Sequence, residues 1–510
     1  MNVPTNSYEP MLRESINHFL ASYRNGCSNF SAFESIFFRL VQTMPDPPLE
    51  ITWFYSAMTF HSSRKSTLLN PLTKALVAKD LLQLLISCSK SSYGTKKIAL
   101  LAPVLYALYD AVCEFSNDDG LSFMGEVETI VEKMVNYICI CCDDLEIYNE
   151  CGDLVICFED LVGVWTLDRV DKCSNVENMA ALFPFLNSGL CRWVNNQRFS
   201  IRNLAGVVMF QVFFLSLSLK FQVGFSQGEL QRDTLNWAVQ TMKRFQNSYF
   251  LDLLLRVLLE PSMPATTILK LDNASLLQKV VYDAVILVDY SFLNSGRWNQ
   301  ILNNHLNDLA LVWTLVADVA IHFARDMRDE ARAESYATAF SESQLPPQLI
   351  KWVTDQVYTE QNSSLPKFPM PKALIKWLLL IEDKGHLVFS ENELKRHARA
   401  AICKPMMVHG HPECKSDSEY STENLCGKEP RQSQASGDEE MVDLLDNSFP
   451  AATFCLEIND NGVTNGGRKH KRGVSDVRER RLKLVKYNVY ETSNGERLLP
   501  FSDEDREVMG

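Results

Sequence analysis

Five side chains that are able to bind a metal ion lie within one stretch of 24 residues, and they are Cys403, His409, His411, Cys414 and Cys426. Thiolate and imidazole are the ligands of structural zinc sites. The spacing between them, however, contains neither a C-x2-C pair nor an H-x3-H pair. The sequence therefore predicts incidental ligands in a loop, and no metal site or cofactor.

A calcium loop is suggested by the polar residues Asn117, Asp119, Gly120 and Glu126, which match ligand and turn positions of an EF-hand. The first position of that loop would be Phe115, where a coordinating carboxylate is required. We therefore predict a connector between two helices rather than a calcium site.

Catalytic motifs are absent from the chain. It contains no G-x-S-x-G, G-x-G-x-x-G, H-E-x-x-H or complete phosphate loop, and Gly94-Thr95-Lys96 reproduces only the end of the last of these. Several histidines, including His18 and His61, stand alone on helical patterns, as packed or surface histidines commonly do. The sequence predicts a protein without catalytic activity, and an enzyme whose site has no linear signature remains the alternative.

A basic cluster over residues 468–486 is the most informative local feature of the sequence. Its two blocks, Arg468–Arg472 and Arg478–Lys483, resemble a bipartite nuclear localisation signal, although the spacer between them is short. A contact with nucleic-acid phosphates and a solvated basic helix are the alternatives. Ser475 follows the first block at a spacing that basophilic kinases accept, which makes it a candidate phosphorylation site. The predicted import residues are Arg468, Lys469, Lys471, Arg472, Arg478, Arg480, Arg481 and Lys483.

A second motif precedes the basic cluster and mixes acidic with apolar residues over Asp438–Phe449. This pattern is typical of a segment that folds in the groove of a partner protein, and a solvated acidic tail is the plainer interpretation. Its apolar members are Met441, Val442, Leu444, Leu445 and Phe449.

Composition limits the classes of protein to which the chain can belong. Its 510 residues are 46% hydrophobic and carry a net charge of −13, so the bulk of the protein should repel nucleic acid. The 14 cysteines lack disulfide-like spacing, and several, such as Cys88 and Cys113, lie in apolar runs where burial is expected. These features predict a reducing compartment, and the N-terminus does not resemble a signal peptide.

Helical periodicity recurs from Met11 to Ile402, with apolar residues three and four positions apart. The longest apolar run, Leu204–Leu219, is too short and too polar for a typical membrane span, so we predict a central buried helix. Further predicted helices are Lys74–Cys88, Ile98–Phe115, Glu126–Cys142, Glu229–Phe245, Ser248–Leu259, Ala274–Asp289 and His305–Phe323.

The sequence contains two internal echoes, that is, two pairs of short segments with similar sequences, and these suggest repeated helical units. Residues 185–189 and 292–296 share the sequence FLNSG, and Arg-Trp follows each of them. Residues 346–352 (PPQLIKW) resemble residues 371–377 (PKALIKW), with proline suited to the first helical turn. Coincidence between similar helix starts is the alternative. Four tryptophans near the echoes are candidate anchors of the units, and they are Trp193, Trp298, Trp352 and Trp377.

Medium-length helices in series with such echoes resemble the armadillo/HEAT class of helical-repeat proteins. The resemblance implies an all-α fold, with an irregular α-solenoid body over residues 1–402. Composition predicts a mostly disordered acidic and polar linker over residues 403–476 and a basic, then acidic, tail over residues 477–510.

These features together predict a nuclear scaffold for protein–protein interactions, in a chromosome- or transcription-associated complex. The expected partners are other nuclear proteins, an import receptor bound by the basic tail, and nucleic acid through weak contacts of that tail, with no membrane. A cytoplasmic adaptor for trafficking or regulation is the alternative, because Leu444-Leu445-Asp446 also suits a cargo or coat peptide.

Overall fold

A computed structural model gives the architecture of the N-terminal four-fifths of the chain. Contacts divide the chain into two units, Met1–Pro412 and Glu413–Gly510, and every described residue belongs to the first. The described residues are 8–27, 29–64, 70–113, 120–143, 158–167, 181–196, 200–222, 227–245, 247–260, 274–290, 303–357 and 366–403.

The described residues form α-helices and contain no β-strand, so the prediction of an all-helical body is confirmed for them. The N-terminal helices are α1 (Glu9–Arg24), α2 (Ser31–Thr43), α3 (Leu49–Arg64), α4 (Pro71–Cys88), α5 (Gly94–Ala99), α6 (Ala102–Cys113), α7 (Gly120–Asp143) and α8 (Phe158–Trp165). The later helices are α10 (Ser188–Asn196), α11 (Ile201–Gln222), α12 (Gln227–Phe245), α13 (Ser248–Val257), α15 (Ala274–Leu287), α16 (Asn303–Asp326), α17 (Glu330–Glu342), α18 (Leu345–Val357), α19 (Pro371–Asp383) and α20 (Asn392–Cys403).

One predicted helix is wrong in its extent. The apolar stretch Ile98–Phe115 is divided into α5 and α6, with a break at Leu100 and Leu101. Pro103 lies in the first turn of α6, where its missing N–H costs no hydrogen bond. Because proline cannot continue a helix from the preceding turn, the continuous apolar pattern conceals a real boundary.

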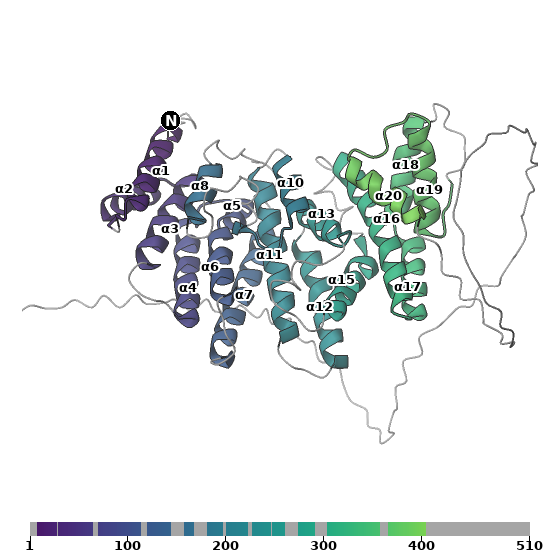
Figure 1. Cartoon of the computed structure of the whole chain (residues 1–510), viewed down its shortest axis with the longest axis horizontal. Coiled ribbons are helices and arrows are strands. Elements are labelled where there is room, and N and C mark those ends of the chain that lie inside the picture. Colours follow the sequence, from purple (N-terminus) through teal and green to yellow (C-terminus); the bar gives the residue numbers. More distant parts are fainter. Residues whose placement is uncertain are drawn as a thin grey trace, which may run out of the picture. The chain divides into compact units, whose positions relative to one another are not determined.

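The helices pack mainly on neighbours in the chain and follow one another across the view in Figure 1 in approximate chain order. Close pairs include α2 with α3, α4 with α6, α12 with α15, and α16 with α17. Helix α11 packs on α5, α7, α12 and α13, and its side chains are buried almost throughout. This confirms the prediction that Leu204–Leu219 forms a buried helix.

Two of the described helices, α11 and α16, are long and apolar enough to cross a membrane by length and composition alone. In α11, 94% of the apolar window is buried inside the protein, and in α16 the buried share is 78%. Core helices that are covered by other helices pass the same compositional test, so the two helices are weak evidence of a membrane span.

The two segments of the second echo, residues 346–352 and 371–377, begin two similar helices. Pro346 and Pro371 lie in the first turns of α18 and α19, and both helices pack on α16. The Leu-Ile pairs of the two helices are buried in equivalent positions, as Leu349-Ile350 and Leu374-Ile375. Trp352 and Trp377 are partly buried against the core. The similar sequences therefore produce two helices that use the same face.

The burial that is expected for cysteines in apolar runs is found for some of them and not for others. Cys113 is exposed and Cys88 is only half-buried, because each lies at the C-terminal end of its helix. None of the described cysteines forms a disulfide, and four of them are buried, namely Cys139, Cys141, Cys142 and Cys191. Burial in an apolar interior is therefore the role of this second group.

Candidate functional site

A groove of about 480 Å³ lies on helices α12, α15 and α17. Its volume is in the range of ligand-binding sites in proteins. Helix α15 packs on both α12 and α17, so the groove is formed where three helices that are separate in the sequence meet. The lining residues are Arg232, Leu235, Asp283, Leu287, Asp329, Ala331, Arg332 and Ser335.

The innermost polar group of the groove is the carboxylate of Asp283, which is buried on α15. Its Oδ2 accepts a hydrogen bond from Nη1 of Arg332, and its Oδ1 accepts one from the hydroxyl of Tyr336 at 2.7 Å. Burial, followed by the charge of Asp283, raises the pKa of Tyr336 well above its usual range, so the phenol stays protonated as a donor. Both oxygens of Asp283 are therefore engaged by groups on α17.

The second carboxylate, Asp329, fixes the start of α17. Its Oδ1 accepts the backbone N–H of Arg332 at 3.2 Å, as an N-cap does. Its Oδ2 accepts bonds from Nε of Arg332 at 3.0 Å and from Nζ of Lys279 at 3.2 Å. Desolvation alone would raise the pKa of Asp329, but these bonds outweigh it and lower the pKa. Arg332 is thus held between two carboxylates and cannot swing away from the groove.

The turn that presents Asp329 is a Schellman motif at the end of α16. The N–H of Asp329 bonds to the carbonyl of Ala324 at 2.9 Å, and the N–H of Arg328 bonds to that of Arg325 at 2.8 Å. Arg328 has φ of 59° in this motif, where glycine is the usual residue. The close junction between α16 and α17 places the N-cap carboxylate against α15.

The outer wall of the groove is both charged and apolar. Arg232 on α12 is exposed and has no ion-pair partner among the residues that the structure describes. Leu287 on α15 keeps 46% of its surface exposed, which is a large fraction for a leucine at a helix–helix contact. Leu235 is partly buried one turn along α12 from Arg232. The wall therefore offers one free cation beside an apolar surface.

The lining of this groove combines charged and apolar side chains, which can recognise a ligand by charge and by contact. None of its lining residues is a histidine or a cysteine. Ser335 therefore has no imidazole beside it within the lining, and both carboxylates already accept bonds from cations.

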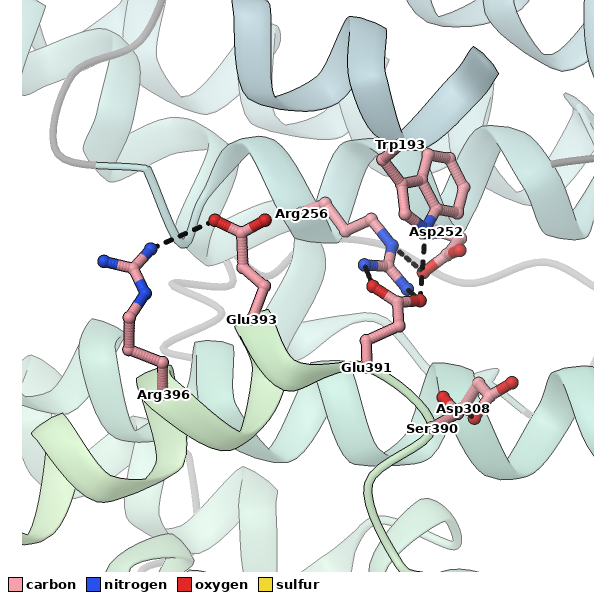
Figure 2. A network of polar contacts seen from close by, with 8 residues as sticks. All are labelled: Trp193, Asp252, Arg256, Asp308, Ser390, Glu391, Glu393 and Arg396. Atoms are coloured by element: carbon pink, nitrogen blue, oxygen red, sulfur yellow. Dashed lines mark hydrogen bonds and ion pairs between the residues drawn. The ribbon is translucent and has the colours of Figure 1, made fainter. Parts of the chain in front are cut away.

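A second polar cluster joins α10 and α13 to the segment before α20 (Figure 2). The carboxylate of Glu391 accepts bonds from both terminal nitrogens of Arg256 and from Nε1 of Trp193. The guanidinium of Arg256 also lies over the Trp193 ring, 4.3 Å from its centroid, and bonds to Asp252 at 3.0 Å. Trp193 also stacks on Tyr249, with ring centroids 5.1 Å apart.

This cluster is a structural junction and not a ligand site. The cavity beside it measures about 20 Å³, which is enough for roughly one water molecule. Desolvation and the nearby Arg396 lower the pKa of His397, which lines this cavity, so the imidazole is neutral at physiological pH. The junction ties residues that are 135 and 198 positions apart in the chain.

Other chemistry-bearing residues from the sequence are occupied by structural contacts. Lys96, from the partial phosphate-loop motif, is buried and forms an ion pair with Asp46 at 2.6 Å. His61 is also buried and lies 2.8 Å from the carbonyl of Val164. Within the described ranges, no group of three His, Cys, Asp or Glu side chains has the geometry of a metal site.

Comparisons with protein-family models, curated proteins and solved structures find no match to this chain.

Most residues that the sequence singled out lie outside the described residues. These are the basic cluster with Ser475, the acidic motif over residues 438–449, Trp298, and four of the five metal-ligand candidates. Cys403 is described and exposed at the end of α20. The groove itself was not predicted from sequence. Only the N-cap aspartate, Asp329, followed by Arg332, carries a local signal, and that signal indicates a helix start.

Proposed function

We propose that this chain is a nuclear helical-repeat scaffold that binds a segment of a partner protein in the groove of α12, α15 and α17. The observation that carries the proposal is the groove itself, with its fixed Arg332, free Arg232 and exposed Leu287. Pre-organised polar groups beside exposed apolar surface lower the entropy cost of binding.

The packing of the helices supports a solenoid-like, armadillo/HEAT-type arrangement. Within the described part of the chain, helices α1 to α4 share no extensive contact with α15 to α20. Repeat proteins have this property, because each unit rests on its neighbours and not on distant units. The paired use of α18 and α19 on α16 is consistent with the same architecture.

Nuclear localisation is the part of the proposal that depends on the tail. The basic cluster that begins at Arg468 would bind an import receptor, and the acidic motif that contains Leu444 and Leu445 would bind a further partner. A chromosome- or transcription-associated complex is the setting that we propose. A cytoplasmic adaptor would have the same groove, so localisation separates the two functions.

Proximity labelling with the full-length protein tests the scaffold function. The change Leu287→Asp places a charge in the apolar wall of the groove and should remove a defined subset of labelled partners. Leu287 is already 46% exposed, so the fold should survive, and the thermal unfolding of the purified variant checks this.

Leu76→Asp is the matched control, because Leu76 is 42% exposed on α4, outside the groove lining. It should leave the set of labelled partners as in the wild type. Recovery of identical partners from both variants and the wild type would show that the groove is not a binding site.

A further inference from the structure

We infer that the groove of α12, α15 and α17 selects an acidic segment of a partner protein, in which a carboxylate lies close to an aliphatic side chain. The carboxylate binds Arg232, and the aliphatic side chain packs on Leu235 and Leu287. This inference rests on the proposed function, since it names the chemistry of the segment that the groove binds.

The charge of the groove is what favours a carboxylate. Asp283 is satisfied by Arg332 and Tyr336, and Asp329 is satisfied by Lys279 and Arg332. Neither carboxylate therefore needs a cation from a ligand. Arg232 remains without an ion-pair partner among the described residues, and a guanidinium can donate two parallel hydrogen bonds to one carboxylate. A carboxylate of the ligand therefore finds a cationic partner in Arg232, whereas a lysine of the ligand finds both carboxylates of the groove already bonded.

The apolar wall is close enough to serve the same ligand. Arg232 and Leu235 are three positions apart on α12, and side chains at this spacing are neighbours on a helix surface, roughly 5–6 Å apart. Asp283 and Leu287 have the corresponding relationship, four positions apart, on α15. Residues in an extended peptide advance by about 3.3 Å each. An acidic residue and a leucine one or two positions apart would therefore reach both surfaces.

Nucleic acid and small carboxylates fit the groove less well. Nucleic-acid affinity comes from several cations that each neutralise a phosphate, but only Arg232 is uncommitted here, and the whole chain carries a charge of −13. Small-molecule sites bury most of the ligand surface. The walls of this groove are open, because Arg232 is exposed and Leu287 is half-exposed. An extended protein segment suits such a surface.

Fluorescence anisotropy with the full-length protein tests the inference. The probe is a fluorescein-labelled short peptide in which two leucines lie between two aspartates, and a second peptide has asparagine in place of both aspartates. The wild type should bind the aspartate peptide more tightly. Arg232→Gln should weaken that binding about threefold and leave binding of the asparagine peptide unchanged. Leu287→Asp should weaken binding of both peptides about tenfold or more.

Controls on other surfaces use the same chemical changes. Arg39→Gln removes an exposed arginine from α2, and Leu76→Asp alters an exposed leucine on α4, so both variants should bind as the wild type does. Equal far-UV circular dichroism and equal melting temperatures among all variants would show that each variant folds.

Three outcomes would overturn the inference. Equal affinity for the two peptides, with both still sensitive to Leu287→Asp, would show a binding groove that does not select acids, and the proposed function would stand. Failure of the aspartate peptide to bind would remove the acidic segment as the ligand, and the proximity-labelling comparison would then decide separately whether the groove binds a partner. Equal competition by a single-stranded oligonucleotide of the same charge would show a general polyanion contact.

Discussion

The carboxylate of Glu391 receives two parallel hydrogen bonds from the guanidinium of Arg256, each 2.8 Å long (Figure 2). Arg256 is 8% exposed on α13, whereas Glu391 lies before α20, so the pair connects two parts of the chain that are 135 residues apart. Bidentate pairs of this kind are among the stronger polar contacts in proteins. This contact therefore fixes how the segment that leads into α20 is held against α13.

Loss of Glu391 should destabilise the body. Glu391→Ala leaves Arg256 with only Asp252 as a partner and removes the acceptor of the Trp193 N–H. Because the side chain of Glu391 is 27% exposed, we expect a cost of about 2–3 kcal/mol, below that of a fully buried pair. Urea unfolding measures it. Glu393→Ala, which breaks an exposed pair with Arg396 nearby, should cost less than about 0.5 kcal/mol. Equal costs would contradict the role of the junction.

Gly94 should tolerate no side chain. A Cβ at this position would lie 2.3 Å from the backbone oxygen of Cys141, because α5 and α7 approach closely there. Gly94→Ala should destabilise the protein by about 1–3 kcal/mol, since one of the two backbones must move. Gly125 on α7 has no atom within 4 Å of its built Cβ, so Gly125→Ala should instead stabilise by about 0.5–1 kcal/mol. Denaturant unfolding measures the change in the free energy of unfolding for each variant. Changes of the same sign in both variants would be inconsistent with this packing.

Acid should weaken the connection between α19 and α20 through Glu382. Desolvation would raise the pKa of this carboxyl, but hydrogen bonds from Lys395, Val388 and Phe389 outweigh it and lower the pKa from 4.5. A lowered pKa in the folded state contributes stability that is present above pH 4.5 and is lost as the pH falls through the folded value. Glu382→Gln should lower the free energy of unfolding by about 2 kcal/mol at pH 7. The stability of this variant should also depend less on pH below 4.5.

Melting temperatures measured from pH 7 to pH 3 test this behaviour. Lys395→Met removes the cation that bonds to Glu382 at 2.9 Å, so it should also flatten the acid dependence. An acid dependence as steep as that of the wild type in both variants would place the responsible carboxylates elsewhere.

Nuclear entry should depend on the basic tail. Nine cations crowd the 19 residues from 468 to 486, so an acidic receptor groove would gain several charge-assisted contacts at once. Replacing Arg468, Lys469, Lys471 and Arg472 by alanine should move a fluorescently tagged protein to the cytoplasm. Ser475→Asp should do so partly, because a negative charge between the two basic blocks opposes docking.

Microscopy of living cells measures how much of each tagged tail variant is in the nucleus. An unchanged nuclear signal in the quadruple variant would mean that another import route operates. A variant that stays nuclear but leaves chromatin at lower salt would instead identify the cluster as a contact with phosphates, because such contacts weaken steeply with salt.

The sequence by itself determined the helices. Apolar residues three and four positions apart predicted the helices from Lys74–Cys88 to His305–Phe323, and proline in the first turn identified the starts of α18 and α19. These signals are local, because a helix is specified by side chains and caps within a few residues. The same locality explains the error at Ile98–Phe115, where an apolar pattern continued across the break before α6.

Only the tertiary structure decided which side chains meet. Arg332 reaches Asp283 across 49 positions, Tyr336 reaches it across 53, and Glu391 reaches Arg256 across 135. No spacing rule connects such pairs, because the face that each helix turns to its neighbours depends on how all the helices pack together. The groove exists where three helices meet, and the partner of each charge follows from that packing rather than from any one segment.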